Sequence, residues 1–121
     1  MRKHDGEIAH RWIVLTEPDG DPPQVVVVNL TSRSPDSDTT VVLNVGDHPF
    51  VKRETVVYYA DARFMEARAI EAYANTPGNR FHADCSVALL QQLRDGLRKS
   101  RFTPKKIKAY CSHHFGQSQN A

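Results

Sequence analysis

The first half of the sequence contains four side chains of the kinds that act on phosphodiesters, namely Arg11, Thr31, Ser32 and His48. An arginine binds a phosphate through paired hydrogen bonds and stabilises developing negative charge, and a histidine moves a proton near neutral pH. We therefore expect Arg11 to hold the phosphate, Thr31 or Ser32 to position it, and His48 to act as acid or base. A structural alternative stays open. In it Arg11 forms ion pairs with surface acids, Thr31 and Ser32 form hydrogen bonds with the loop backbone, and His48 caps a turn.

A second set of residues, made up of His82, Cys85, Cys111 and His113, offers imidazole and thiolate ligands at short spacing. Zinc prefers four such ligands arranged as a tetrahedron. The spacing is only loosely like that of a zinc finger, and Cys85 is equally explained as a small buried residue at the start of a helix. We therefore expect no metal and no other cofactor, with a zinc-stapled regulator as the alternative.

Positive charge is concentrated near the C-terminus. Residues 94–108 carry one acid, Asp95, against seven bases, whereas the rest of the chain has nine bases and thirteen acids. A basic segment on an acidic body is typical of proteins that bind polyanions. The alternative is a solvated helix face, since basic residues favour helix C-termini. The bases that would contact RNA phosphates are Arg94, Arg98, Lys99, Arg101, Lys105, Lys106 and Lys108.

The elements that must position these groups can be read from apolar patterns and turn residues. β-Branched and aromatic residues predict strands at 11–17, 24–31, 40–45 and 55–60. Four consecutive valines, Val25–Val28, indicate a strand buried on both faces. The first two strands should form a hairpin, which places the start of one beside the end of the other. We therefore expect Arg11 and Thr31 at one end of the sheet, facing a common groove.

The second half of the chain favours helices. Residues 62–74 fit either a helix or a continuing strand. A helix is predicted over 86–99, capped by Asp84 or Ser86, and a short helix over 105–110 after Pro104. The apolar stripe of the helix over 86–99 should consist of Val87, Leu90, Leu93 and Leu97.

The chain of 121 residues fits one domain, 1–121, in the β-rich α+β class. We expect a barrel over about 8–75, a helical part over about 84–111 and a frayed tail over 116–121, with a fifth strand in 62–68 or 4–10.

Two cysteines, a polar N-terminus and the shortness of the apolar run Val25–Val28 indicate a cytoplasmic protein away from membranes. Walker, Rossmann, Gly-x-Ser-x-Gly and His-Glu-x-x-His motifs are absent from the sequence.

Three segments in order, Arg11–Leu15, Val25–Ser32 and Lys52–Val57, resemble the MazF/PemK family of plasmid-maintenance and chromosomal toxins. The first resembles the family's Arg-Pro-x-x-Val-Leu segment with Trp12 in place of proline, the second its valine-rich strand ending in Thr-Ser, and the third its Lys-Asp-Ser-x-Val stretch. The predicted helix 86–99 takes the place of the family's C-terminal helix.

The resemblance implies an SH3-like small barrel, a homodimer and a cognate antitoxin whose extended segment covers an RNA groove. It also implies an endoribonuclease that uses the 2′-hydroxyl of its RNA substrate, without a metal. Arg11, Thr31 and Ser32 match the family's functional positions, whereas His48 comes from the residue chemistry alone. The alternative is a non-catalytic barrel that binds protein or nucleic acid through its strands and its basic C-terminal segment.

Overall fold

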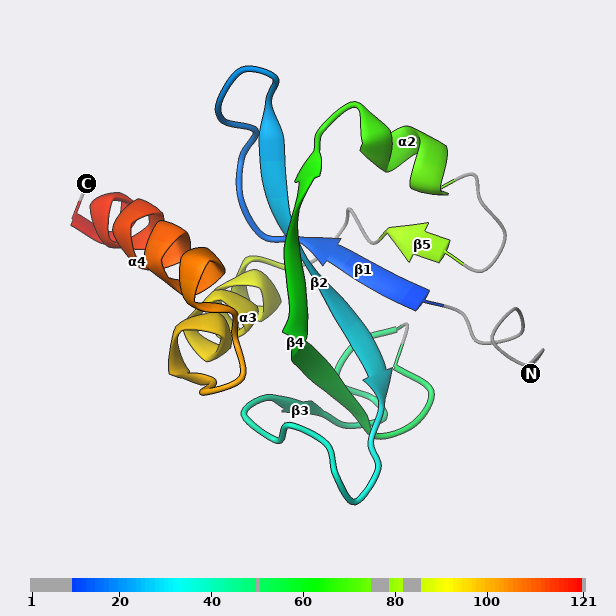
Figure 1. Ribbon diagram of the computed structural model, residues 1–121. Helices are drawn as coiled ribbons and strands as arrows, with labels where there is room; N and C mark the ends of the chain where they lie inside the picture. Colours follow the sequence, from blue (N-terminus) through cyan, green and yellow to red (C-terminus); the bar gives the residue numbers. More distant parts are fainter. Residues whose placement is uncertain (1–9, 50, 75–78, 82–85, 121) are drawn as a thin grey trace.

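A curled sheet with helices on both faces forms the body of the protein (Figure 1). The computed structural model describes residues 10–49, 51–74, 79–81 and 86–120. The elements follow the order β1 (His10–Val14), β2 (Gln24–Ser32), β3 (Val42–Leu43), β4 (Thr55–Glu66), α2 (Ala69–Ala74), β5 (Asn79–Phe81), α3 (Val87–Lys99) and α4 (Lys105–Asn120). The sheet order is β3-β4-β2-β1-β5, and among the described strands β1 and β5 alone pair in parallel. The antiparallel strands curl into a half-barrel, so the α+β class and a small barrel-like shape are as expected.

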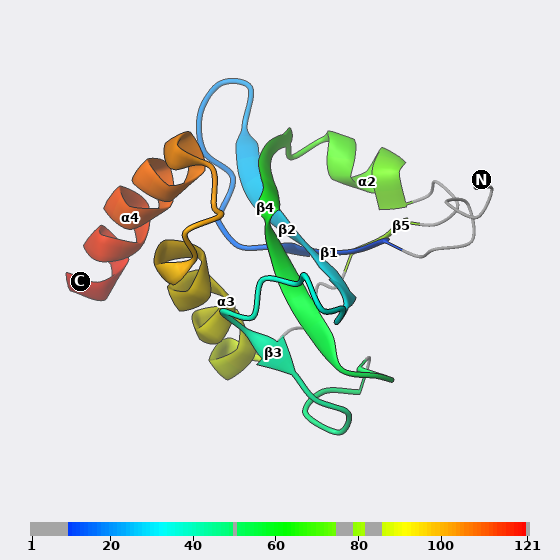
Figure 2. The ribbon, with the colours of Figure 1, turned by 60° about the horizontal axis from the view of Figure 1, so that its bottom comes forward.

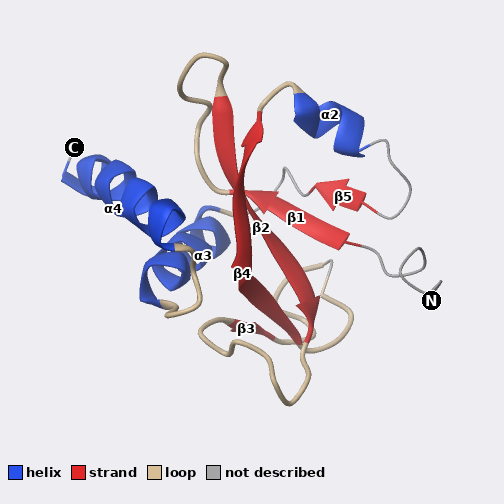
Figure 3. Ribbon diagram, in the orientation of Figure 1, coloured by secondary structure: helices blue, strands red, loops and turns tan. Residues whose placement is uncertain are grey.

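The sheet buries apolar side chains on both faces, and Figure 3 shows α3 and α4 on one side and α2 on the other. Successive strand residues point to opposite faces, so the four valines of β2 divide between two clusters. The second core contains Trp12, Val25, Val27 and Met65 and lies under α2. The main core includes Ile13, Leu15, Val26, Val28, Leu30, Leu43, Val57, Tyr59, Leu89, Leu93, Leu97, Ile107 and Cys111. The predicted burial of β2 on both faces is confirmed.

The predicted hairpin is present as β1 and β2. Arg11 pairs with Leu30 and Val14 with Val27, in regular antiparallel register. On the other side of β2, the register with β4 shifts between Val27 and Asn29, where β4 bulges. Because the register between β1 and β2 is regular, the hairpin determines on which face of the sheet each side chain of these two strands lies.

Residues 62–74 divide between the two alternatives that the sequence left open. The strand β4 continues to Glu66, and the helix α2 begins at Ala69. The fifth strand is β5, at 79–81, and not at 62–68, because those residues already belong largely to β4. The other expected position, 4–10, lies outside the described residues except for His10. At the C-terminus α4 is helical to Asn120, beyond Tyr110 and through most of the expected tail.

The helix α3 begins as predicted, because the Ser86 hydroxyl caps it by accepting from the Leu89 amide at 3.0 Å. The predicted apolar stripe needs correction. The buried residues of α3 are Leu89, Leu93, Gly96 and Leu97, whereas Val87 is 85% exposed. Gly96 lets the helix approach β4 closely, and this contact sets the helix rotation.

No helix among residues 10–49, 51–74, 79–81 and 86–120 combines the length and the apolar character needed to cross a bilayer.

Candidate functional site

Four strands bring their termini together at one end of the sheet, which we call the Ser32 end. Here β1 begins, β2 and β3 end and β4 begins, and Ser32 and Leu43 both pair with Thr55. Arg11 lies one pair from this end, opposite Leu30. The hairpin thus brings Arg11 to the same end as the hydroxyls that close β2.

The side chains at the Ser32 end divide between the two faces of the sheet. Arg11 shares the main-core face with its partner Leu30, and Ser32, two residues further, lies on that face too. Thr31 lies on the opposite face, because adjacent residues of a strand alternate. Arg11 and Thr31 therefore do not face a common groove, contrary to expectation, and Ser32 is the hydroxyl residue that shares a face with Arg11.

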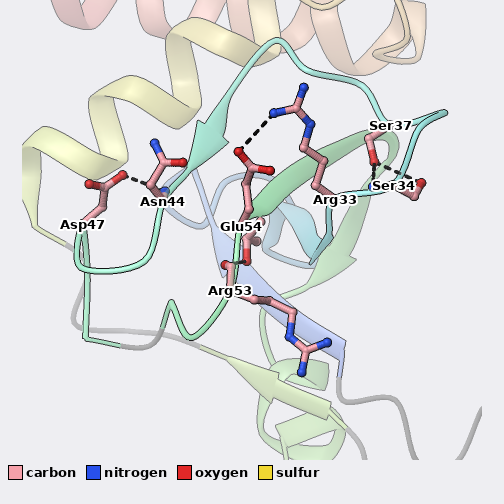
Figure 4. A network of polar contacts seen from close by, with 8 residues as sticks. Arg33, Ser34, Ser37, Asn44, Asp47, Arg53 and Glu54 are labelled. Carbon is pink, nitrogen blue, oxygen red and sulfur yellow. Dashed lines mark hydrogen bonds and ion pairs between the residues drawn. The ribbon is translucent and has the colours of Figure 1, made fainter.

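His48 follows β3 in a tight turn at the same end, and Figure 4 shows two residues of this turn, Asn44 and Asp47. The Asn44 amide donates to the Asp47 carboxylate at 2.8 Å, and Gly46 adopts a φ of 97°, which other residues rarely accept. The Val51 amide donates to the His48 carbonyl at 3.0 Å, and Val51 anchors the turn in the main core. The half-buried His48 is therefore carried by an ordered turn.

Two further cations lie at the Ser32 end and were not among the predicted site residues. Lys52 and Arg53 are exposed just before β4. Figure 4 shows Arg53 extending away from the neighbouring ion pair between Arg33 and Glu54, which measures 3.1 Å. The adjacent bases at 52 and 53, before a predicted strand, are the sequence signal that could have identified them.

On the second-core face, Thr31 borders a small polar cavity of about 260 Å³. The loop after β2 runs across β4 towards the end of α3 (Figure 2), and its side chains line this cavity together with Val56 and Tyr58. Hydroxyls and carboxylates make up most of its lining, from Thr31, Ser32, Ser34, Asp36, Ser37, Asp38 and Tyr58. Thr31 thus lies on a different face from Arg11, whereas Ser32, the last residue of β2, borders this cavity and also shares the face of Arg11.

Asp38 fastens that loop to α3. Its carboxylate accepts from the Ser100 hydroxyl at 2.6 Å and from the amide and hydroxyl of Thr40 at 2.9 and 2.6 Å. Partial burial raises the pKa of Asp38, but these hydrogen bonds and the charge of Arg101 outweigh burial, so the pKa lies below its ordinary value. The ionised carboxylate is therefore a structural fastening between the loop and the helix end.

The basic segment 94–108 divides between structural and exposed side chains. Arg94 is partly buried and donates from Nε to the Leu15 carbonyl at 2.8 Å. Arg98 lies 3.8 Å from Asp95, and Lys108 is half-buried. The exposed cations are Lys99, Arg101, Lys105 and Lys106, which surround the turn between α3 and α4. Four of the seven predicted RNA-contacting bases are thus exposed, and the other three are partly buried.

The thiol of Cys111 is used in packing. Cys111 is fully buried in the main core, and burial raises its pKa to about 11, with a smaller opposing effect of Arg94. His113 is exposed, and His82 and Cys85 lie outside the described residues. Among the residues that the structure describes, no three His, Cys, Asp or Glu side chains are grouped closely enough to hold a metal.

Comparison of the chain with protein-family models, with curated proteins and with solved structures gave no match.

Proposed function

We propose that this protein is a toxin-like endoribonuclease with an SH3-like barrel, which cleaves RNA at the Ser32 end without a metal. The observation that carries the proposal is the position of Arg11 and Ser32 on one face, at the end where the His48 turn leaves β3. Catalysis needs fixed groups on ordered elements, and both strands and the turn are held by backbone hydrogen bonds.

In the proposed reaction the RNA supplies the nucleophile. Its 2′-hydroxyl loses a proton and attacks the adjacent phosphorus, the bond to the 5′-oxygen breaks, and that oxygen takes up a proton. One product therefore ends in a 2′,3′-cyclic phosphate and the other begins with a 5′-hydroxyl. Arg11 stabilises the charge on the phosphate, Ser32 positions it, and His48 moves a proton. Thr31 has no part in this version of the site.

Cleavage of single-stranded RNA in the presence of EDTA tests the proposal. Replacing Arg11 with Ala should slow cleavage by at least ~10²-fold, the usual scale for losing one charge-stabilising donor. Ser32→Ala should also slow it, and the 2′-deoxy substrate should resist. Thr31→Val is the matched control, because it removes the neighbouring hydroxyl from the other face. If Arg11→Ala cuts as fast as wild type, or if wild type cuts no RNA sequence offered, the nuclease proposal is wrong.

A second candidate function is RNA binding without cleavage. It is favoured by the exposure of Lys99, Arg101, Lys105 and Lys106, whereas Arg11 is half-buried. The same preparation distinguishes the two candidates, because a non-catalytic module retains intact RNA in a gel-shift assay and releases no cyclic phosphate.

The proposed toxin would act as a homodimer and bind an antitoxin that covers the Ser32 end. Light scattering of the purified chain measures its oligomeric state. Growth arrest on expression, relieved by Arg11→Ala, would support the toxin role, and unaffected growth with wild type would count against it.

A further inference from the structure

An exposed aromatic ring lies among the cations at the turn between α3 and α4. Phe102 is 49% exposed, and the Arg101 guanidinium carbon lies 5.0 Å from the centroid of its ring. Lys99 precedes the turn, and Lys105 and Lys106 follow it, all three exposed. Within the described part of the chain, none of these three lysines forms an ion pair. We call Lys99, Arg101, Phe102, Lys105 and Lys106 the Phe102 surface.

The turn that carries Phe102 is firmly held. The Phe102 amide donates to the Ser100 hydroxyl at 3.1 Å, and that hydroxyl in turn donates to Asp38. The buried Thr103 hydroxyl donates to the Leu97 carbonyl at 2.8 Å. Phe102 is thus displayed to solvent by an ordered backbone, which lowers the entropy lost when a ligand binds to it.

We propose that the Phe102 surface binds single-stranded RNA, with one unpaired base stacked on Phe102 and the flanking phosphates on the lysines. An exposed ring beside cations matches the combination by which proteins hold single strands, since every base has an aromatic face. Paired bases are already stacked within the duplex, so a duplex offers phosphates to the lysines but no base to the ring. This inference rests on RNA being the ligand, as proposed above, but not on cleavage.

The surroundings of Phe102 orient the strand. A groove of about 570 Å³ separates Phe102 and Lys99 from the loop at 35–40, which carries Asp36 and Asp38. Phosphates are repelled by these carboxylates, so we expect the backbone to follow Lys105 and Lys106, which do not line this groove. The edge of the stacked base then faces the loop, where the exposed Asp36 carboxylate accepts from an N–H group of the base.

Fluorescence anisotropy with a short fluorescein-labelled 2′-O-methyl oligouridylate tests the proposal, because this RNA cannot be cleaved. Phe102→Ala should weaken binding by roughly 5- to 100-fold, the scale of losing one stacked base, without changing the salt dependence. Phe102→Trp should restore it. Lys105→Gln with Lys106→Gln should weaken binding and reduce the salt slope by about 0.7 per lysine.

The matched control is Val87→Ala, which removes another exposed apolar side chain at the opposite end of α3 and should leave affinity unchanged. A duplex of this oligonucleotide with its 2′-O-methyl complement should bind more weakly, and its affinity should be the same for Phe102→Ala and wild type. Equal affinity of Phe102→Ala and wild type, or no binding of the oligonucleotide by wild type, would overturn the inference. Stacking without any cleavage would retain it while removing the nuclease proposal.

Discussion

One carboxylate, that of Asp38, joins the loop after β2 to the end of α3. Both of its oxygens are used, one by Thr40 and the other by Ser100. Ser100 in turn accepts from the amide of Phe102. The position of the exposed Phe102 ring therefore depends on the charge of Asp38, which lies far from it in the sequence.

We predict that Asp38→Asn lowers stability at neutral pH and that its effect fades in acid. The folded-state pKa of Asp38 lies below its ordinary value of 3.8. The stabilisation is therefore complete above pH 3.8 and is lost as the pH falls through the folded-state pKa. Urea unfolding of wild type and variant across this range measures the difference. Asp36→Asn, an exposed carboxylate of the same loop, should remain close to wild type at neutral pH. A difference that persists unchanged in strong acid would contradict the prediction.

The helix α3 packs closely against β4 because Gly96 has no side chain at the contact. A methyl group at Gly96 would come within 3.0 Å of Cζ of Tyr59 and closer still to its hydroxyl and to Val41. The Tyr59 hydroxyl donates to the Leu93 carbonyl at 2.7 Å, so the ring cannot move aside without losing that bond. This contact explains why α3 turns Leu89 towards the sheet and leaves Val87 outside.

We predict that Gly96→Ala destabilises the protein, although glycine to alanine within a helix usually gains about 1 kcal/mol. Overpacking in a close-packed interior costs about 1–3 kcal/mol, and the lost tyrosine hydrogen bond adds to that cost. The free energy of unfolding in urea should fall, whereas exposed Gln92→Ala on the same helix should leave it unchanged or slightly higher. An increase in stability for Gly96→Ala would mean that α3 does not pack this closely.

The first turn of α4 contains Lys105 and Lys106 and no acid. This is unfavourable for a helix, because its N-terminus carries partial positive charge, whereas Lys99 near the end of α3 is placed favourably.

Lys106→Glu should therefore raise the free energy of unfolding by about 0.3–1 kcal/mol and Lys99→Glu should lower it by a similar amount. Both changes should weaken RNA binding, because both remove a cation from the Phe102 surface. Thermal melts and anisotropy on the same two variants separate the effects. Equal RNA affinity in wild type and both variants would show that these lysines do not bind the strand.

Local patterns predicted the strands, the hairpin and the cap at Ser86, because alternation, turn residues and capping act over a few residues. The position of β5 depends on a parallel partner far away in the chain, so the sequence did not reveal it. The rotation of α3 depends on Tyr59 opposite Gly96, which no pattern within the helix contains. Arg11 and Thr31 were predicted at the right end, but their faces depend on a register that shifts by single residues.

Two apolar clusters lie on opposite faces of one sheet. Trp12, the only tryptophan of the sequence, belongs to the second core, whereas α3 and α4 cover the main core. Because β2 contributes valines to both, neither cluster can lose its packing without disturbing the strand that the other needs.

We therefore predict a single unfolding transition. Tryptophan fluorescence reports on the second core and far-ultraviolet circular dichroism on the helices, and the two urea curves should coincide. Val27→Ala and Val28→Ala should each lower stability by about 2 kcal/mol and should shift both curves together. Separate midpoints for the two signals would show that the clusters unfold independently.

The central strand β2 is paired with β1 on one side and β4 on the other, and Val25–Leu30 are buried. An amide in such a strand reaches deuterium only when the whole sheet opens, so its exchange rate reports the global free energy of unfolding. We expect the amides of Val26–Val28 to be the slowest to exchange in deuterium oxide, measured by NMR, and those of the two-residue strand β3 to exchange sooner. Rapid exchange within β2 would be incompatible with its central place. Exchange in this strand thus supplies a reference value, against which the free energy of local opening elsewhere in the molecule can be compared.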